Sequence, residues 1–383
     1  MSRPITVDEV ASFPYAGVDE CDLSADGLRI AYTHRGQIYI TTLETSNVSE
    51  PFKGRSPKWS PSQPDVLAFL KPESSGIWLR YIDGTERQLG GDTQDINFVQ
   101  WSFDGQFIAL IANRDLEIPD ENNDEDIVIV CPPALTFVSE IFILHVDTGE
   151  VSRVAESIAG ESYEGLAWHP NGNWLTVFSN IESQHQSDTN WHLFDIDLKS
   201  GNKNNRIGPG KNEMTLPSWS PCGNFLAFGY SPYSYIHPVR NLCAIMERDS
   251  KQVQILSDEY FIDFVCWGDD GQKVYCSGLK GISRHVLSVD IRSGRKEVVV
   301  ERTGWTYLSG ISRDGKTLLT VFRGLLSLPD IRVISLNSGQ ERTVTRFSDQ
   351  LTNYELGEAS VVEWESYDGL TIQGCVVSPL GKL

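Results

Sequence analysis

The chain has 383 residues, 40% of them hydrophobic and 10% aromatic, and its 52 acidic against 32 basic residues give a formal net charge of −20. This composition supports a large folded core and excludes a wholly disordered chain, and no apolar run approaches the roughly 18 residues that span a bilayer. The negative charge, without a cluster of Lys and Arg, argues against nucleic acid or an anionic membrane as a partner.

The amino-terminal part, residues 1–20, is predicted to be an extension of the main domain. It has no apolar stretch of signal-peptide length, so we expect a cytoplasmic protein. Thr6 to Phe13, with acids at its start, is a possible short helix. The seven cysteines are odd in number and form no C-x-x-C pair, and several lie in apolar runs such as Phe264-Val-Cys-Trp267. We expect reduced, buried thiols.

One motif recurs seven times along residues 21–360: an anchor residue, Trp or aliphatic, followed by Ser-x-Asp-Gly or a variant of it. The copies are Leu23-Ser-Ala-Asp-Gly27, Trp59-Ser-Pro-Ser-Gln-Pro-Asp65, Trp101-Ser-Phe-Asp-Gly105, Trp168-His-Pro-Asn-Gly172, Trp219-Ser-Pro-Cys-Gly223, Trp267-Gly-Asp-Asp-Gly271 and Ile311-Ser-Arg-Asp-Gly315. We expect the anchors to wedge neighbouring units together rather than to form an aromatic ligand cage. The Asp-Gly and Asn-Gly pairs are expected to accept the positive φ angles of a tight hairpin turn. The glycines concerned are Gly27, Gly105, Gly172, Gly223, Gly271 and Gly315.

Each copy is followed by alternating apolar residues, as in Arg29-Ile-Ala-Tyr32, and then by a second hairpin, as in Gln37-Ile-Tyr-Ile-Thr-Thr-Leu43. Two hairpins make a four-stranded antiparallel sheet, which cannot bury both faces alone. The sequence therefore predicts an all-β fold, a seven-bladed β-propeller of four-stranded antiparallel blades. The seven hairpin pairs are complete in chain order, so the first and last blades can abut without exchanging a strand.

Two other folds fit the pattern less well. An α/β domain needs amphipathic helical patterns of about ten residues or more between its strands, and none are present. A two-sheet sandwich could use the same hairpins, but it does not explain the sevenfold spacing of one motif.

The widest spacing between anchors, from Trp101 to Trp168, contains an acidic insertion over residues 113–133. Asp120, Asn122 and Asp124 match the first, third and fifth positions of a calcium loop. Glu125, however, stands where the sharp turn needs Gly, and Cys131 stands where a bidentate Glu is needed. We therefore expect a solvated acidic loop, with no metal and no cofactor. Its candidate contacts with a substrate or a partner domain are Arg114, Asp115, Glu117, Asp120, Glu121 and Asp124.

The seven histidines are scattered, and His169 occupies the position where other repeats have Ser. No serine has glycines both two positions before and two positions after it, so the nucleophile elbow of a serine hydrolase is absent from this sequence. We expect packing roles for the histidines, and no catalytic residue in this chain.

The repeats resemble those of TolB-like proteins and of the prolyl oligopeptidase family of serine peptidases. Two further segments favour the peptidases. Val361-Val-Glu-Trp-Glu-Ser-Tyr-Asp-Gly-Leu-Thr-Ile-Gln-Gly-Cys-Val-Val-Ser-Pro379 resembles the stretch by which these peptidases leave the propeller and enter the α/β-hydrolase domain. The opening around Leu23-Ser-Ala-Asp-Gly-Leu-Arg-Ile-Ala-Tyr32 is similar to that of the acylaminoacyl-peptidase and dipeptidyl-peptidase branch.

The resemblance implies a non-catalytic propeller, residues 21–360, that admits short peptides to a hydrolase domain, with residues 361–383 as the junction toward that domain. The partners implied are the α/β-hydrolase domain, in cis in the family, and short peptides. The net charge favours a cationic peptide amino terminus. One rival is a TolB-like or WD-repeat-like interaction propeller with no enzymatic role. Another is a propeller enzyme with its site in the channel, which needs converging carboxylates or metal ligands.

Overall fold

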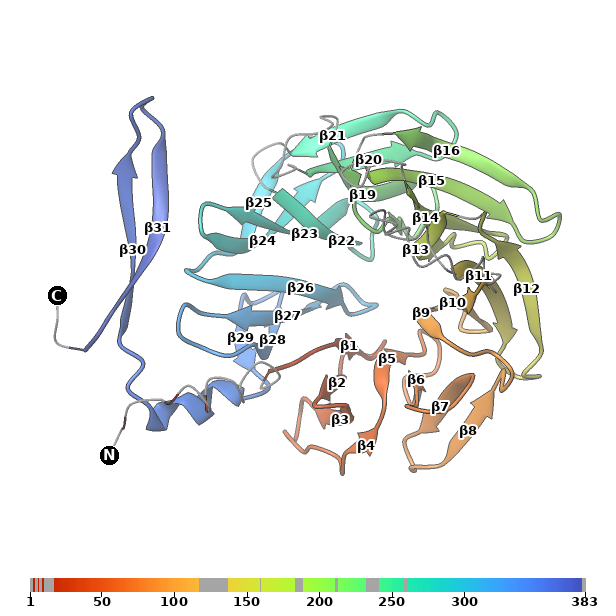
Figure 1. Cartoon of the computed structure of the whole chain (residues 1–383), viewed down its shortest axis with the longest axis horizontal. Helices are drawn as coiled ribbons and strands as arrows, with labels where there is room; N and C mark the ends of the chain where they lie inside the picture. Colours follow the sequence, from red (N-terminus) through yellow and green to blue (C-terminus); the bar gives the residue numbers. More distant parts are fainter. Residues whose placement is uncertain are drawn as a thin grey trace, which may run out of the picture.

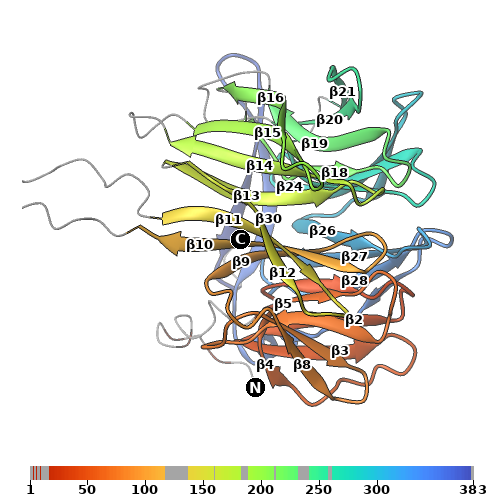
Figure 2. The same ribbon diagram turned by 90° about the vertical axis from the view of Figure 1, so that its right-hand side faces the viewer.

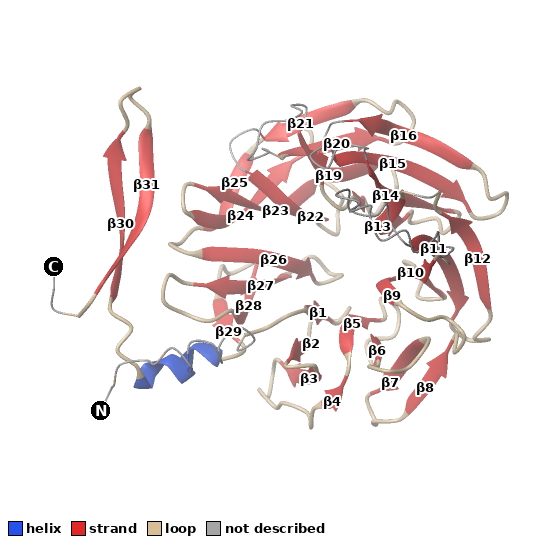
Figure 3. Ribbon diagram, viewed as in Figure 1, coloured by secondary structure: helices blue, strands red, loops and turns tan. Residues whose placement is uncertain are grey.

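The computed structural model describes residues 3, 6, 9, 17–116, 137–158, 160–182, 189–210, 213–231, 241–257 and 261–380. The described residues form almost only β-strands, arranged as seven blades around a ring with one further hairpin standing beside it (Figures 1 and 3). The sheets of blades 6 and 7 are joined by one parallel bridge between Arg284 and Trp305. The prediction of an all-β, seven-bladed propeller is confirmed.

The strands follow one another blade by blade along the chain. Blade 1 contains β1 (Cys21–Leu23), β2 (Arg29–His34), β3 (Gln37–Thr42) and β4 (Phe52–Lys53). Blade 2 contains β5 (Arg55–Trp59), β6 (Val66–Leu70), β7 (Ile77–Tyr81) and β8 (Glu86–Leu89). Blade 3 contains β9 (Ile96–Trp101), β10 (Phe107–Asp115), β11 (Phe137–His145) and β12 (Val151–Glu156). Blade 4 contains β13 (Glu161–Trp168), β14 (Trp174–Glu182), β15 (Thr189–Asp197) and β16 (Lys203–Gly210).

In blade 5 the first strand is divided in two. Its elements are β17 (Glu213–Met214), β18 (Ser218–Trp219), β19 (Phe225–Ser231), β20 (Leu242–Glu247) and β21 (Val253–Ser257). Blade 6 contains β22 (Phe261–Trp267), β23 (Lys273–Lys280), β24 (Ser283–Asp290) and β25 (Lys296–Val300). Blade 7 contains β26 (Trp305–Ile311), β27 (Thr317–Arg323), β28 (Asp330–Ser335) and β29 (Glu341–Thr343). A 3-10 helix, η1 (Phe347–Asn353), leads to the hairpin of β30 (Glu358–Glu365) and β31 (Thr371–Ser378).

The antiparallel order divides the ring into two faces. The turns between the first and second strands and between the third and fourth strands of each blade lie on one face, which we call the turn face. The ends of the second strands, the starts of the third strands and the links between blades lie on the opposite face, the loop face. Figure 2 shows the ring from the side, with the end of β10 pointing to the left, on the loop face.

The hydrophobic core lies between the blades. Among the described residues, each of the seven seams between neighbouring blades has its own buried apolar cluster. The cluster that closes the ring joins Ile30 and Tyr32 of blade 1 to Leu319, Ile331 and Val333 of blade 7. The sheets of these two blades share no strand, so the ring closes by side-chain packing, a point that the sequence left open.

The five Trp anchors are buried, with at most 8% of each residue exposed: Trp59, Trp101, Trp168, Trp219 and Trp267. Four of their indole N–H groups donate to the preceding blade: to the carbonyl oxygens of Lys58, Gln100 and Ser218 at 2.8–3.1 Å, and to Thr176 Oγ1 at 2.9 Å. We call each of these bonds a Trp staple. The anchors have the packing role that the sequence predicted.

The turn glycines adopt the expected backbone conformation, with φ between 62° and 73°: Gly27, Gly105, Gly172, Gly223, Gly271 and Gly315. The expectation that the preceding Asp or Asn shares positive φ is wrong, because no described residue of that kind in these turns does so. In blade 1 the Asp26 carboxylate instead accepts the backbone N–H of Leu28 at 3.0 Å and the hydroxyl of Ser24. The aspartate therefore caps the turn with its side chain rather than with its backbone.

The possible helix from Thr6 to Phe13 lies largely outside the described residues. Of this segment the structure describes Thr6 and Glu9, whose carboxylate accepts the backbone N–H of Thr6 at 2.9 Å. In the part of the chain that is described, no helix is long and apolar enough to cross a membrane.

Candidate functional site

The acidic insertion leaves and rejoins the propeller on the loop face of blade 3. Of the candidate contacts, Arg114 and Asp115 end β10, whereas Glu117, Asp120, Glu121 and Asp124 lie outside the described residues. The site is therefore described from the strand ends that carry the insertion.

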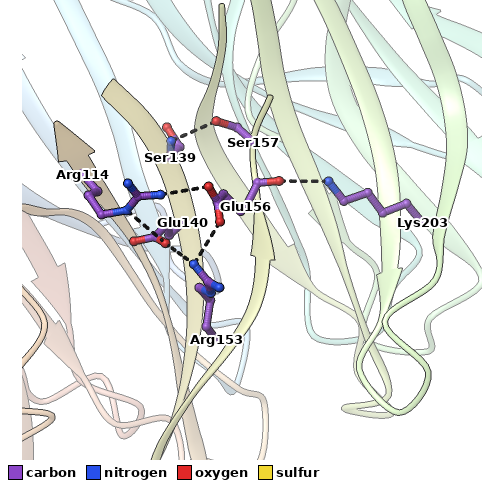
Figure 4. Close-up of polar contacts among 7 residues, drawn as sticks. All are labelled: Arg114, Ser139, Glu140, Arg153, Glu156, Ser157 and Lys203. Carbon is purple, nitrogen blue, oxygen red and sulfur yellow. Dashed lines mark hydrogen bonds and ion pairs between the residues drawn. The ribbon is translucent and has the colours of Figure 1, made fainter. Parts of the chain in front are cut away.

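Arg114 belongs to a network of ion pairs with two glutamates and a second arginine (Figure 4). Its Nη2 lies 2.9 Å from Glu156 Oε1 and its Nε 3.5 Å from Glu140 Oε1. Arg153 Nη1 lies 2.6 Å from Glu140 Oε1 and 2.9 Å from Glu156 Oε2. Since Glu140 is 93% buried, its charge depends on both arginines. The side chain of Arg114 thus holds β10, β11 and β12 together at the base of the insertion.

The network continues across the seam to blade 4. Lys203 Nζ on β16 donates to the backbone oxygen of Glu156 at 3.3 Å and to the Tyr163 hydroxyl at 3.0 Å. Ser139 Oγ accepts the backbone N–H of Tyr163 at 3.2 Å. Burial raises the pKa of Tyr163 well above its usual value, so this phenol stays protonated at neutral pH. These contacts fix the base of the insertion against both blades.

A cleft of about 400 Å³ opens beside Arg114 on the loop face. It is lined by the link from blade 2 to blade 3 and by the ends of β10 and β11. The lining residues are Asp92, Thr93, Gln94, Asp95, Ala112, Asn113, Arg114, Asp115, Glu140 and Phe142. Carboxylates outnumber the single arginine, so the cleft is acidic. It can accommodate a cationic group.

Sequence reasoning missed a buried acid–base pair in blade 4. His192 Nε2 lies 3.2 Å from Glu161 Oε1, and Ser179 Oγ donates to the same oxygen at 2.8 Å. Burial raises the pKa of Glu161, but the hydrogen bonds from His192 and Ser179 outweigh burial and lower it. The serine donates to the carboxylate rather than to the histidine, so these three residues do not form the serine–base pair that nucleophilic catalysis needs. Only the strand register, Ser179 opposite His192, brings them together.

His169 has the packing role that the sequence predicted. It is buried, its Nε2 lies 3.0 Å from the Gly223 carbonyl oxygen of the next blade, and its ring packs on Trp174 and Trp219. Burial lowers its pKa, which keeps the ring neutral at physiological pH.

The six described cysteines are all free thiols. Four are buried or half-buried, as expected, and burial raises the pKa of Cys21 to about 11 and that of Cys266 to about 12. The expectation of burial is wrong for Cys222 and Cys375, which are exposed because one lies in a turn and the other on the free-standing hairpin. In the described ranges, no three His, Cys, Asp or Glu side chains lie close enough together to bind a metal ion.

The hairpin of β30 and β31 is the second feature of the loop face. The backbone N–H of Ile282, in the turn between β23 and β24, donates to Gln373 Oε1 at 3.4 Å. Cys375 lines a cleft of about 280 Å³ against Ile282 and Trp305. Gln373 and Cys375 therefore point toward the ring.

The opposite side of this hairpin carries no partner among the described residues, although it is apolar. Side chains alternate between the two sides of a strand, and cross-strand neighbours share a side. The outward side carries Glu358 and Ser360 near its base, together with five apolar side chains that are between 36% and 64% exposed: Val362, Trp364, Leu370, Ile372 and Val376. An apolar surface of this kind is typical of an interaction site.

Comparison with known proteins connects this architecture to peptidases. No family model and no curated protein matches the sequence. Among solved structures, the chain is similar to an acylaminoacyl peptidase from Pyrococcus horikoshii, with a TM-score of 0.71 and 14% identity over 95% of this chain and 58% of that one. It is similar to the β-propeller domain of the Trilobed protease from Pyrococcus furiosus, with a TM-score of 0.63 and 15% identity over 87% of this chain and 99% of that one. It is also similar to dipeptidyl peptidase 4 from Porphyromonas gingivalis, with a TM-score of 0.57 and 15% identity over 96% of this chain and 58% of that one.

These likenesses establish the fold. The chain spans 58% of the length of the acylaminoacyl and dipeptidyl peptidases that it matches, and almost all of the isolated propeller domain. The protein has a seven-bladed β-propeller fold similar to the matched parts of these peptidase structures, followed by one hairpin whose outward side is largely apolar.

Proposed function

We propose that the chain is the substrate-gating propeller of a cytosolic serine peptidase of the prolyl oligopeptidase family, and that the catalytic residues belong to an α/β-hydrolase domain outside it. The observation that carries this proposal is the hairpin of β30 and β31. Its sequence resembles the first hairpin of that hydrolase domain, and its apolar outward side is free of partners within the described residues. The peptidase-like propeller fold supports the same assignment.

The loop face is the side that we assign to the hydrolase and its substrate. The hairpin contacts the ring there through Gln373, and the insertion begins there at Arg114 and Asp115. The acidic cleft beside Arg114 suits a cationic group, which a short peptide provides at its amino terminus. In this proposal the insertion residues and the cleft guide short peptides toward the hydrolase, and the ring excludes larger chains.

The purified chain should hydrolyse no acylaminoacyl or dipeptidyl substrate, because it lacks a nucleophile elbow. Turnover that survives purification and is blocked by a serine-directed fluorophosphonate would overturn the assignment of catalysis to another domain. A substitution of Arg114 would test the gating role. In the complete peptidase, Arg114→Ala should change KM for short peptides more than kcat.

The rival, an interaction propeller without a hydrolase, predicts a different role for the hairpin. A self-sufficient propeller should fold without residues 361 to 383. The proposed function instead predicts that the exposed hairpin promotes self-association, and that Trp364→Lys, on the outward side, reduces it. Light scattering of the chain with and without this substitution distinguishes the two.

A further inference from the structure

The turn between the third and fourth strands follows one pattern in six of the seven blades. A residue with positive φ donates its backbone N–H to the carbonyl oxygen four residues before it. Blades 1 and 5 have Ser46 and Lys251 at this position, with φ of 59° and 55°. The other four blades have glycine there, with φ between 68° and 75°: Gly149, Gly201, Gly294 and Gly339. Because a side chain strains the backbone in this conformation, Ser46 and Lys251 each need a compensating role.

The role of Ser46 is structural, whereas the contacts of Lys251 leave part of its side chain unused. Ser46 Oγ accepts Arg342 Nη2 at 2.6 Å across the closing seam. Lys251 Nζ donates to the carbonyl oxygen of Asn205, in blade 4, at 2.6 Å. An ammonium group has three N–H donors, and the other two have no acceptor among the described residues. Lys251 is therefore held at the seam between blades 4 and 5 with donors to spare.

The side chain of Lys251 lines a cleft of about 470 Å³ on the turn face, between the neighbouring blades 4 and 5 (Figure 1). One wall is fixed by Arg206, whose side chain is 4% exposed and whose Nη2 lies 2.6 Å from Asp195 Oδ2. The guanidinium of Arg206 also packs on the ring of Trp219, 4.6 Å from its centroid. Three acidic and three basic residues line the cleft with an amide and an indole: Asp195, Asp197, Asp249, Arg206, Arg248, Lys251, Asn204 and Trp174.

Polar groups of both signs remain unused in this cleft. Arg248 donates to Asp249 through Nε and Nη2, at 2.9 and 3.0 Å, and its Nη1 has no acceptor in the described part of the chain. Asp197 Oδ1 accepts the backbone N–H groups of Lys199 and Ser200 and the Ser200 hydroxyl, whereas Oδ2 accepts no bond from a described residue. The bonds from Ser200 lower the pKa of Asp197, so this carboxylate is charged at neutral pH.

These charges favour a ligand that carries both signs. A simple anion would be repelled by the net charge of −20, which acts over the whole surface. A simple cation would leave the donors of Lys251 and Arg248 without an acceptor. A molecule with one ammonium and one carboxylate group has no net charge and supplies a partner for each side. The volume of the cleft is sufficient for a small molecule of this kind.

We propose that this cleft binds a small zwitterion with a free ammonium and a free carboxylate group, as in an amino acid or a dipeptide. Lys251 and Arg248 hold the carboxylate, and Asp197 holds the ammonium group. Lys251 thereby has the role that compensates for the loss of glycine from its turn. The inference does not depend on the proposed function, because the cleft lies on the turn face, whereas the hairpin and the acidic insertion lie on the loop face.

The first test is isothermal titration calorimetry of the full chain with glycylglycine at millimolar concentration. Two capped forms serve as controls: N-acetylglycylglycine, which lacks the ammonium group, and glycylglycine amide, which lacks the carboxylate. Each capped form should bind at least about tenfold more weakly, since it loses one charge-assisted contact. Glycine, titrated in the same way, shows whether the cleft takes an amino acid or needs the length of a dipeptide. Equal binding of capped and uncapped forms, or binding of neither glycine nor glycylglycine, would overturn the proposal.

The second test is a matched pair of variants at the same turn position. Lys251→Gly should weaken binding of the zwitterion about tenfold and leave the melting temperature unchanged or higher, because glycine relieves the strain. Ser46→Gly, in blade 1, should leave binding unchanged. Equal effects of the two variants on binding, or a lower melting temperature with unchanged binding in Lys251→Gly, would give Lys251 a structural role only and overturn the proposal.

A third variant separates the two ends of the ligand. Asp197→Asn keeps an oxygen for the turn bonds but removes the charge, so it should weaken binding of the uncapped ligand and not that of its N-acetyl form. Equal weakening of both would contradict the assignment of the ammonium group to Asp197. None of these readouts needs a peptidase, so the cleft can fail as a binding site while the proposed function stands, and the reverse.

Discussion

Four consecutive seams, which join blade 2 to 3, 3 to 4, 4 to 5 and 5 to 6, are held together differently from the seam between blades 7 and 1. In each of these four seams, one indole N–H donates a hydrogen bond to the preceding blade. The donors are Trp101, Trp168, Trp219 and Trp267. Blade 1 has Leu23 at the anchor position, so the closing seam has no such bond, and an apolar cluster with the side chain of Arg342 on the Leu43 carbonyl joins the two blades instead. A repeated motif therefore builds most of the ring, and contacts that do not repeat close it.

The largest effect expected of this difference comes from removing an anchor in a stapled seam. Trp168 is 2% exposed and packs between blades 3 and 4. Trp168→Ala should lower the free energy of unfolding by about 3–5 kcal/mol, through the cavity and the lost staple. Ile311→Ala, at the anchor position of blade 7, should cost less because Ile311 is only partly buried. Equal losses in urea denaturation would contradict a special role for the Trp seams.

Glycine substitutions in two equivalent turns sharpen the comparison further. Gly223 and Gly172 have nearly the same φ, 70° and 72°, but a Cβ at Gly223 would lie 2.5 Å from His169 Nε2 across the seam, and one at Gly172 would meet nothing within 4 Å. Gly172→Ala should cost about 1–2 kcal/mol from the backbone alone. Gly223→Ala should lower the free energy of unfolding by about 1–3 kcal/mol more than Gly172→Ala does, because the new methyl group would clash with His169. Thermal unfolding of both variants measures the difference, and equal costs would mean that the turn does not press on the neighbouring blade.

A milder substitution isolates the staple itself. Trp101 Nε1 donates to the Lys58 carbonyl oxygen at 3.0 Å, whereas the buried Trp59 Nε1 has no hydrogen-bond partner among the described residues. Trp101→Phe should therefore cost about 1 kcal/mol more than Trp59→Phe. If urea denaturation gives the same loss for both, the hydrogen bond contributes nothing and packing alone holds the stapled seams.

Acidification should lower the stability of the propeller in two stages. Burial lowers the pKa values of His169 and His285 below 6.5 in the folded chain, so the unfolded chain binds protons first and stability falls as the pH drops below about 6.5. The pKa of Glu161 is lowered below 4.5, so its contribution is present above 4.5 and is lost as the pH falls through the folded value. His169→Ser, the residue that other repeats have, should reduce the first stage in a series of urea titrations. An unchanged first stage would exclude His169 as its source.

The sequence predicted the structural features that recur in every blade, and few of the contacts that occur only once. Seven copies of one motif were sufficient for the blade count, the burial of the Trp anchors and the positive φ of the six glycines. Trp59 shares the motif, yet its indole N–H has no acceptor in the described part of the chain. Whether an acceptor lies within reach depends on how blade 1 is placed, which the motif around Trp59 does not determine. The network of Arg114, Glu140 and Glu156 was missed for a similar reason: it depends on strand register across three strands, which no local pattern reveals.

The candidate site was predictable only in part. The insertion was evident from the spacing of the anchors, and the structure places Arg114 and Asp115 at its base beside an acidic cleft. The outward apolar side of the hairpin depends on which of its two sides meets the ring, and this is a tertiary property. The resemblance to a hydrolase junction identified the segment but not its orientation.

The central proposal is that this propeller acts together with the catalytic domain of a serine hydrolase. The most direct measurement is to isolate the native protein from its source cells with an antibody against the propeller, determine its mass and treat it with a fluorophosphonate probe. The account predicts a species well above 42.8 kDa, or a complex, that carries a labelled serine. A native protein of 42.8 kDa that is free of partners and unlabelled would contradict it.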